Sequence, residues 1–203
     1  MTRPRKKSPI TPRQGVWIFG YGSLMWDPGF PCLEAHPALL RGYHRVFCIY
    51  SIRFRGTSER PGLVLGLDRG GSCRGRVFRV AAARAEEVFA YLYERELVHY
   101  SYARKFLPVR LADRTVQAYT YVADREHHRY TGKLTLEQSI KLILRGHGRS
   151  GSNVDYLRNT IRHLDELGIS DGPLHQLLEV VERKSRVSSL HAGVWHRRAP
   201  GCR

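Results

Sequence analysis

Short runs of aromatic and β-branched residues, separated by glycine turns, constrain the fold of this chain more than any other feature. Such runs predict short β-strands, because these side chains pack well on a pleated surface and glycine permits tight reversals. The predicted strands cover residues 16–19, 43–50, 63–67, 73–80, 106–111 and 116–122. Few helical segments lie between them, which favours an antiparallel or mixed sheet that curls toward a barrel.

One helical pattern lies between the predicted strands, and the others follow the last strand. Apolar residues at helical spacing predict helices over residues 85–100, 134–144 and 153–167, with Gly168 as the stop of the third and a last helix starting at Asp171. Thr135 and Gln138 stand at capping-box spacing, which marks the start of the second helix. The chain has 203 residues, 42% of them hydrophobic, and can bury one substantial core. We therefore predict an α+β fold with a single domain over residues 16–183.

The formal charge of +16 belongs mostly to the two ends of the chain. Residues 1–15 and 183–203 together hold eleven Lys and Arg and no acidic residue, which leaves +5 for residues 16–182. Basic ends of this kind are commonly solvated arms that bind polyanions without sequence readout. We expect residues 1–15 to be a flexible basic arm and residues 184–203 a basic tail. A basic RNA- or ribosome-associated protein is the binding hypothesis that this charge leaves open.

Several classes of protein are disfavoured by the composition. No apolar run approaches the roughly 20 residues that cross a bilayer, and the basic N-terminus leads to no apolar signal segment. The four cysteines show no Cys-x-x-Cys and no histidine at ligand spacing. We expect a soluble cytoplasmic protein without a membrane span, a disulfide framework or a metal site.

The segment Gly20-Tyr21-Gly22-Ser23-Leu24 follows the first predicted strand directly. Two glycines at the end of a buried strand allow a ligand to approach the main chain, and successive N–H groups can then form a cradle for an oxyanion or carboxylate. The alternative is a tight structural turn. The third glycine of a dinucleotide loop and the Gly-Lys-Ser/Thr of a phosphate loop are both missing, so nucleotide binding is weakly supported.

Glu96 extends an apolar stripe on the predicted helix over residues 85–100. In an α-helix Ala85, Phe89, Leu92 and Glu96 fall within one narrow arc. Burial and the negative end of the helix would both raise the pKa of this carboxyl group, which suits proton transfer near neutral pH. An ion pair with an arginine such as Arg95 or Arg104 is the structural alternative.

The combination of these motifs resembles the ChaC family of γ-glutamylcyclotransferases. The segments that carry the resemblance, in this order, are residues 19–24, 60–65, 75–80, 91–96 and 150–157. The resemblance covers roughly residues 16–182 and leaves out the basic ends. It implies a small mixed β-barrel with surrounding helices. It also implies a cytosolic enzyme that cleaves glutathione into 5-oxoproline and cysteinylglycine, with no metal or organic cofactor.

The family's functional residues carry over onto particular positions of this chain. The resemblance implies that Gly20, Tyr21, Gly22, Ser23 and Leu24 form the substrate loop and that Glu96 is the catalytic acid and base. Tyr156 matches a tyrosine near the family's active site. After Glu96 the family often has a glycine-containing turn, whereas this chain continues with residues 97–100. A cyclotransferase acting on other γ-glutamyl amines or amino acids is the alternative enzyme hypothesis.

Overall fold

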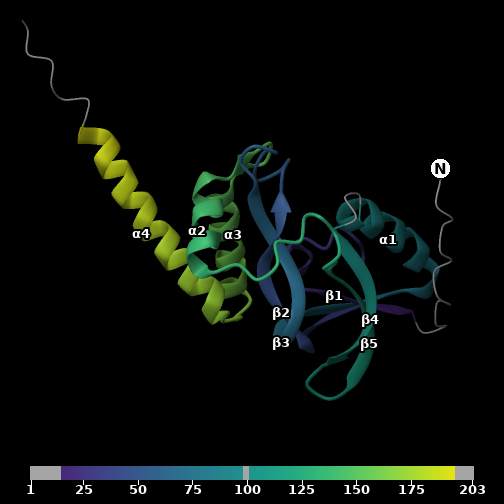
Figure 1. Cartoon of the computed structure of the whole chain (residues 1–203). Helices are drawn as coiled ribbons and strands as arrows, with labels where there is room; N and C mark the ends of the chain where they lie inside the picture. Colours follow the sequence, from purple (N-terminus) through teal and green to yellow (C-terminus); the bar gives the residue numbers. More distant parts are fainter. Residues whose placement is uncertain (1–14, 98–100, 195–203) are drawn as a thin grey trace, which may run out of the picture. The chain divides into compact units, whose positions relative to one another are not determined.

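The computed structural model describes residues 15–97 and 101–194, which divide into two compact units. The first unit takes its residues from 1–49 and 65–132, and the second from 50–64 and 133–203. Figure 1 shows the strands and α1 of the first unit, and the three longer helices of the second. The predicted basic arm therefore lies outside the described residues, apart from Gly15. At the other end the helix α4 (Gly172–Val194) continues past residue 184.

Five strands of the chain close into a barrel. They are β1 (Val16–Gly20), β2 (Glu34–Ser51), β3 (Gly62–Val80), β4 (Tyr102–Arg110) and β5 (Thr115–Ala123), in the spatial order β1-β3-β2-β4-β5. β1 pairs antiparallel with β3, where Ile18 lies opposite Phe78, and parallel with β5, where Ile18 lies opposite Tyr119. This parallel pairing beside antiparallel ones makes the barrel mixed, so the predicted α+β fold with a small mixed barrel is confirmed.

Two strands are longer than their sequence patterns predict. β3 is one continuous strand, although residues 69–72 predict a turn between two separate strands. Gly70 and Gly71 have φ of 102° and 66°, so they bend the strand locally without reversing it. β2 begins nine residues before the predicted start at residue 43. Its pairing with β4 through Leu39 and Leu40 supplies the hydrogen bonds that local composition does not reveal.

The helix α1 (Ala85–Leu92) covers part of the barrel in the first unit. It follows the short helix η2 (Ala82–Arg84) and begins with the buried residue Ala85. Its buried face joins one apolar cluster with residues of β1, β3 and β5. The predicted apolar stripe is confirmed as far as Leu92, which is fully buried. This packing places the C-terminal end of α1 beside the chain that follows β1.

Three helices pack against one another in the second unit, namely α2 (Leu136–Arg145), α3 (Asn153–Glu166) and α4. Thr135 caps α2 in the predicted capping box, since its hydroxyl accepts from Gln138 N and the Gln138 side chain accepts from Thr135 N. A two-stranded hairpin of β6 (His147–Gly148) and β7 (Gly151–Ser152) connects α2 to α3. Gly168, with φ of 65°, follows the end of α3 as expected.

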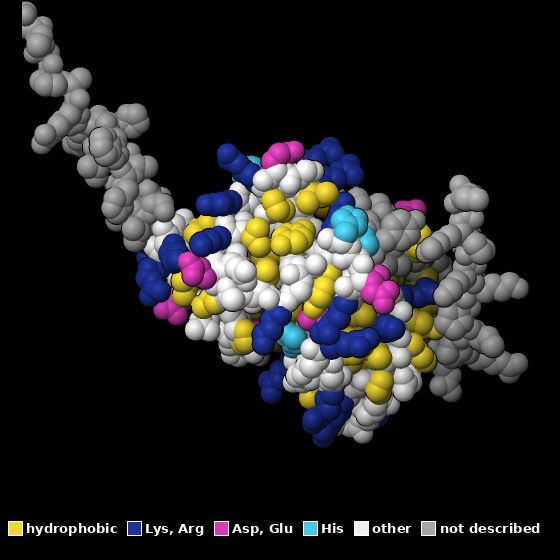
Figure 2. Space-filling view, in the orientation of Figure 1, with side chains coloured by type: hydrophobic (Ala, Val, Ile, Leu, Met, Phe, Trp, Pro, Cys, Tyr) yellow, Lys and Arg dark blue, Asp and Glu magenta, His cyan; other side chains and the backbone are white. Residues whose placement is uncertain are grey.

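The described helices and one face of the surface bear on the membrane and nucleic-acid hypotheses. None of the helices that the structure describes is long and apolar enough to cross a membrane. On the face drawn in Figure 2, Lys and Arg side chains are dispersed among neutral and hydrophobic ones and do not gather in one patch. The hypothesis of nucleic-acid binding depended on the two ends of the chain, most of which lie outside the described residues, and stays a hypothesis.

Candidate active site

The loop after β1 folds back tightly over the end of the strand. β1 ends at Gly20, and the short helix η1 (Ser23–Met25) begins three residues later. A Cβ at Gly20 would lie only 2.9 Å from Leu24 Cβ, so this position requires a residue without a side chain. Tyr21 and Leu24 are both buried. Gly20 thus allows the tight turn of the structural alternative, and that same turn places the backbone N–H groups that a binding site would use.

Three consecutive carbonyl groups of this loop have protein donors. Their hydrogen bonds are Arg45 Nε to Tyr21 O (2.5 Å), Met25 N to Gly22 O (2.9 Å) and Asp27 N to Ser23 O (2.8 Å). The N–H groups of residues 22–24 belong to the same three peptides. Because the C=O and N–H of a trans peptide point in opposite directions, these N–H groups are directed away from the three donors. Two of them also open η1, where N–H groups lack intrahelical partners.

Arg45 holds the loop from the buried face of β2. This residue of β2 is only 4% exposed, and its Nη2 donates to Arg74 O on β3 (2.6 Å) and approaches Met25 Sδ (3.8 Å). The guanidinium therefore connects β2, β3 and the loop after β1. Its positive charge lies on the carbonyl side of the first loop peptide, and the field of that charge favours a negative group on the N–H side.

The sequence interpretation missed Arg45, although a signal for it exists. Arg45 alternates with Phe47 and Ile49, so period-two spacing places all three on one face of the strand. Phe47 and Ile49 are each 2% exposed, which makes this the core face. A charged residue at such a position has to be compensated by buried acceptors, and here Tyr21 O and Arg74 O provide them.

Glu96 lies in a π-helical turn, η3 (Tyr93–Leu97), which follows α1 directly. The predicted helix over residues 85–100 is therefore helical as far as Leu97 but is not α-helical after Leu92, and residues 98–100 lie outside the described part. A π turn closes with i→i+5 hydrogen bonds, so the spacing that placed Glu96 on the apolar stripe does not extend through it. The Glu96 side chain is also outside the described residues, and its proposed role stays a prediction. Turns of this type occur frequently at functional sites.

The structure nevertheless places the loop at residues 20–24 close to the residue that precedes Glu96. Arg95, the residue before Glu96, donates from Nη2 to Ser23 Oγ at 2.9 Å. The contact joins residues 72 positions apart. The loop at residues 20–24 and the turn that carries Glu96 are thus neighbours within the first unit.

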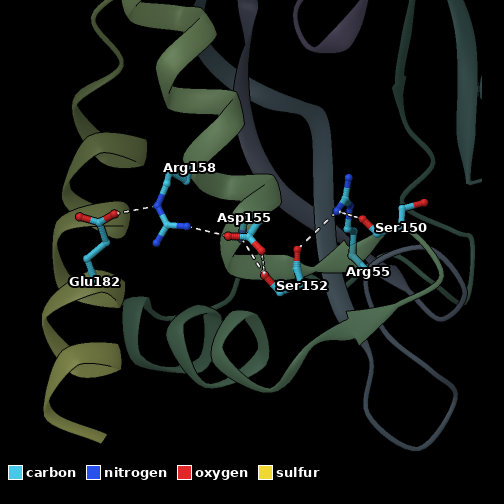
Figure 3. A network of polar contacts seen from close by, with 6 residues as sticks. All are labelled: Arg55, Ser150, Ser152, Asp155, Arg158 and Glu182. Atoms are coloured by element: carbon cyan, nitrogen blue, oxygen red, sulfur yellow. Dashed lines mark hydrogen bonds and ion pairs between the residues drawn. The ribbon is translucent and has the colours of Figure 1, made fainter. Parts of the chain in front are cut away.

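Tyr156 belongs to the second unit, where it lies in the first turn of α3 and is half-buried. The guanidinium carbon of Arg55 lies 5.0 Å from the centre of its ring, a cation–π contact. Arg55 also donates to the carbonyl oxygens of Ser150 and Ser152 in the hairpin before α3 (Figure 3). Arg55 therefore holds the ring of Tyr156 and the hairpin together.

The start of α3 is fixed by a chain of polar contacts that Figure 3 shows. Ser152 caps the helix, because its Oγ accepts from Asp155 N (3.0 Å) and donates to Asp155 Oδ2 (2.6 Å). The hydrogen bond from Ser152, with the nearby Arg158, lowers the pKa of Asp155. Arg158 in turn reaches Glu182 of α4 at 3.0 Å. These contacts fix the helix turn on which Tyr156 stands.

Asn153 is a second structural residue that sequence interpretation missed. It is fully buried and bonds both backbone groups of Leu63, with Nδ2 donating to the carbonyl oxygen (2.8 Å) and Oδ1 accepting from N–H (2.6 Å). An amide can satisfy a donor and an acceptor at once, whereas a carboxylate cannot. Asn153 thus attaches the beginning of β3 to the beginning of α3.

Comparisons with known proteins agree on one family. The family model described as "ChaC-like protein" matches residues 16–184. A glutathione-specific gamma-glutamylcyclotransferase of Escherichia coli is 35% identical over 169 residues, which cover 83% of this chain and 73% of the relative. The enzyme of the same name from Schizosaccharomyces pombe is 30% identical, over 86% of this chain and 96% of its own. A crystal structure of a γ-glutamylcyclotransferase specific to glutathione from yeast superposes with a TM-score of 0.76 and 25% identity, covering 84% of this chain and 96% of that one.

Proposed function

Because the chain belongs to the ChaC-like family, we propose that it is a γ-glutamylcyclotransferase that degrades glutathione to 5-oxoproline and cysteinylglycine. The similar enzymes of Escherichia coli and Schizosaccharomyces pombe bear the name of this activity, and the chain covers most of each. The observation that carries the proposal is the row of peptide N–H groups at residues 22–24. The carbonyl oxygens of the same three peptides accept hydrogen bonds from Arg45, Met25 and Asp27.

The reaction is an intramolecular aminolysis. The α-amine of the γ-glutamyl group attacks its own γ-carbonyl carbon, a new C–N bond closes the five-membered lactam, and the original amide C–N bond breaks. One proton moves from the attacking nitrogen to the leaving cysteinyl nitrogen. No electron transfer and no water are needed, so the chemistry requires neither a redox cofactor nor a metal-bound nucleophile. The enzyme has to fold the substrate, stabilise an oxyanion and move this proton.

Each of these tasks falls to residues of the proposed site. The N–H groups of Gly22, Ser23 and Leu24 bind oxygens of the γ-glutamyl group, at the place where Gly20 lets the loop fold back. Glu96 takes the proton from the amine and returns it to the leaving group. Tyr21 would contact the substrate as part of the loop, and Tyr156 stays a candidate substrate-binding residue on the family resemblance alone. Glutathione is abundant in the cytoplasm, and we place the enzyme there.

The test is turnover of glutathione by the full chain, with 5-oxoproline and cysteinylglycine measured by mass spectrometry. Glu96→Gln keeps the shape of the side chain and removes the base, so turnover should fall by about a thousandfold or more. Glu94→Gln is the matched control, since Glu94 is exposed in the same turn and should leave turnover close to wild type. Near wild-type release of 5-oxoproline by Glu96→Gln would refute the assignment of Glu96.

The substrate is tested in the same assay. γ-Glutamyl-alanine offers the same γ-glutamyl group with a different leaving amine, so the loop and the acid would serve both compounds. We expect glutathione to have the higher kcat/KM. A higher value for γ-glutamyl-alanine would instead support the alternative cyclotransferase, and no product from either compound would remove the proposed function.

A further inference from the structure

Arg95 fastens the loop after β1 to the helical segment that precedes Glu96. Its Nη2 donates to Ser23 Oγ (2.9 Å), and its Nη1 donates to the carbonyl oxygen of Asp27 (2.9 Å) and to the hydroxyl oxygen of Tyr91 (2.7 Å). The side chain is only 20% exposed. One planar guanidinium therefore connects the start of η1, the chain two residues past its end and the last turn of α1. A single-point cation such as lysine could not make this set of contacts.

Tyr91 extends the same attachment to the far end of the loop. Its ring packs edge-on against Phe30, with 6.4 Å between the ring centres. Its hydroxyl lies where a Cβ of Gly29 would be, and Gly29 has a φ of 70°, so both the space and the conformation require glycine there. The pair Tyr91 and Arg95 thus holds the loop at Ser23, at Asp27 and at Gly29.

The contact with Arg95 also fixes the direction of the Ser23 hydroxyl. A guanidinium nitrogen carries donors and no acceptor, so Ser23 Oγ accepts the hydrogen bond with a lone pair. The hydroxyl hydrogen then points away from Arg95 and is available to another acceptor. The nearby positive charge polarises the O–H bond and strengthens it as a donor. Ser23 therefore presents two donors, its hydroxyl and its backbone N–H.

We propose that Arg95 is a positioning residue for catalysis, one that directs the Ser23 hydroxyl toward an oxygen of the bound γ-glutamyl group. It also holds the loop at a constant distance from η3, the turn that carries Glu96. The inference rests on the proposed function for its substrate. It adds a side-chain donor to the backbone donors of the loop and assigns a role to the arginine that precedes the acid.

A double-mutant cycle between Arg95 and Ser23 tests this role. Arg95→Met keeps the aliphatic length and removes all the hydrogen bonds, whereas Ser23→Ala removes only the hydroxyl. Each should lower kcat/KM for glutathione about tenfold or more, and the double variant should be no more than about threefold below the weaker single variant, because contacting residues are not additive. Arg95→Lys should fall between wild type and Arg95→Met. Arg84→Met is the control, since Arg84 pairs with Glu87 on the exposed surface before the same helix.

Hydrogen exchange of the loop gives a readout that needs no turnover. In Arg95→Met the amides of residues 21–30 should exchange faster than in wild type, whereas in Arg84→Met they should not. If the fold losses of kcat/KM in the two single variants multiply in the double variant, the two residues act independently and the proposal is wrong. Unchanged hydrogen exchange in Arg95→Met would also overturn it. If wild type releases no 5-oxoproline, the proposed function fails, and the exchange rates still decide whether Arg95 holds the loop.

Discussion

The Nε atom of Arg45 lies 2.5 Å from the carbonyl oxygen of Tyr21 and donates a hydrogen bond to it. This contact determines the orientation of the peptide whose N–H belongs to Gly22. A buried cation on one strand of the barrel thereby sets the direction of a donor in the loop that follows another strand. The orientation of this loop peptide therefore depends on a buried residue of the barrel strand β2.

Arg45→Met should impair both stability and substrate binding. The substitution removes the hydrogen bonds from Arg45 to Tyr21 O and Arg74 O, which costs about 1–3 kcal/mol for each hydrogen bond. The free loop peptide can then rotate, and KM for glutathione should rise about tenfold. Urea denaturation and steady-state kinetics on the folded protein measure the two effects. Arg45→Lys, which keeps the charge, should lose less on both scales, and equal KM values for wild type and Arg45→Met would contradict the expectation.

Gly20→Ala should lower activity through a clash in the loop. The new Cβ would approach Leu24 Cβ to 2.9 Å, so the residues that supply the N–H groups must move. A displacement of this kind typically costs one to two orders of magnitude, and we expect kcat/KM to fall about tenfold to a hundredfold. Gly172→Ala is the control glycine, because nothing lies within 4 Å of its added Cβ. Unchanged kinetics in Gly20→Ala would show that the loop tolerates the shift.

Asn153→Ala should destabilise the fold strongly. It removes both hydrogen bonds to Leu63 and leaves a buried N–H and a buried carbonyl without partners, a loss of about 2–5 kcal/mol. Asn159→Ala, at an exposed position of the same helix, should change the free energy of unfolding by less than about 0.5 kcal/mol. Chemical denaturation of both variants gives the comparison. Similar midpoints for the two would mean that the Leu63 contacts add little.

The stability contributed by His175 should decrease as the pH rises. Its Nε2 donates to Asp165 Oδ1 (2.8 Å) and its Nδ1 to the carbonyl oxygen of Asp171 (2.7 Å), so both ring nitrogens have acceptors and the doubly protonated ring is favoured. The hydrogen bond to Asp165, followed by that to Asp171, raises the pKa of His175. A raised folded pKa gives stability that is complete below the unfolded value of about 6.5 and is lost as the pH rises through the folded value.

Thermal unfolding of His175→Gln against wild type measures this effect. The difference in Tm should be largest below pH 6.5 and should shrink toward alkaline pH. Asp165→Asn removes the main cause of the raised pKa and should flatten the pH dependence. A Tm difference that stays constant across the range would exclude this titration as its source.

Local patterns predicted most of the helices and the type of sheet. The capping box of Thr135 and Gln138 and the glycine stop at Gly168 depend on neighbours within a few residues, and both lie where the sequence places them. The presence of the strands was recognisable from composition, but their lengths were not. Gly70 and Gly71 look like a turn, and only pairing with neighbouring strands keeps β3 continuous.

The sequence predicted the motif of the candidate site but not the distant residues that hold this motif in place. The loop at residues 20–24 is contiguous, and its tight turn depends on Gly20, which the sequence marks. Arg45 and Arg95 act on it from positions 24 and 72 residues away, and no periodicity links them to the loop. The π turn at Tyr93–Leu97 was also not predictable, because helix propensity does not distinguish it from an α turn.

The parallel pairing of β1 with β5 has a consequence for the way the protein is made. Trp17 pairs with Ala118 and Ile18 with Tyr119, so the barrel joins segments about a hundred residues apart. Such long-range closure is slow, because the loop entropy is lost before the contacts form. A nascent chain that has emerged only as far as β4 still has β1 with an open edge. Synthesis must therefore pass residue 119 before the barrel can close, and until then β1 offers its free edge to other chains.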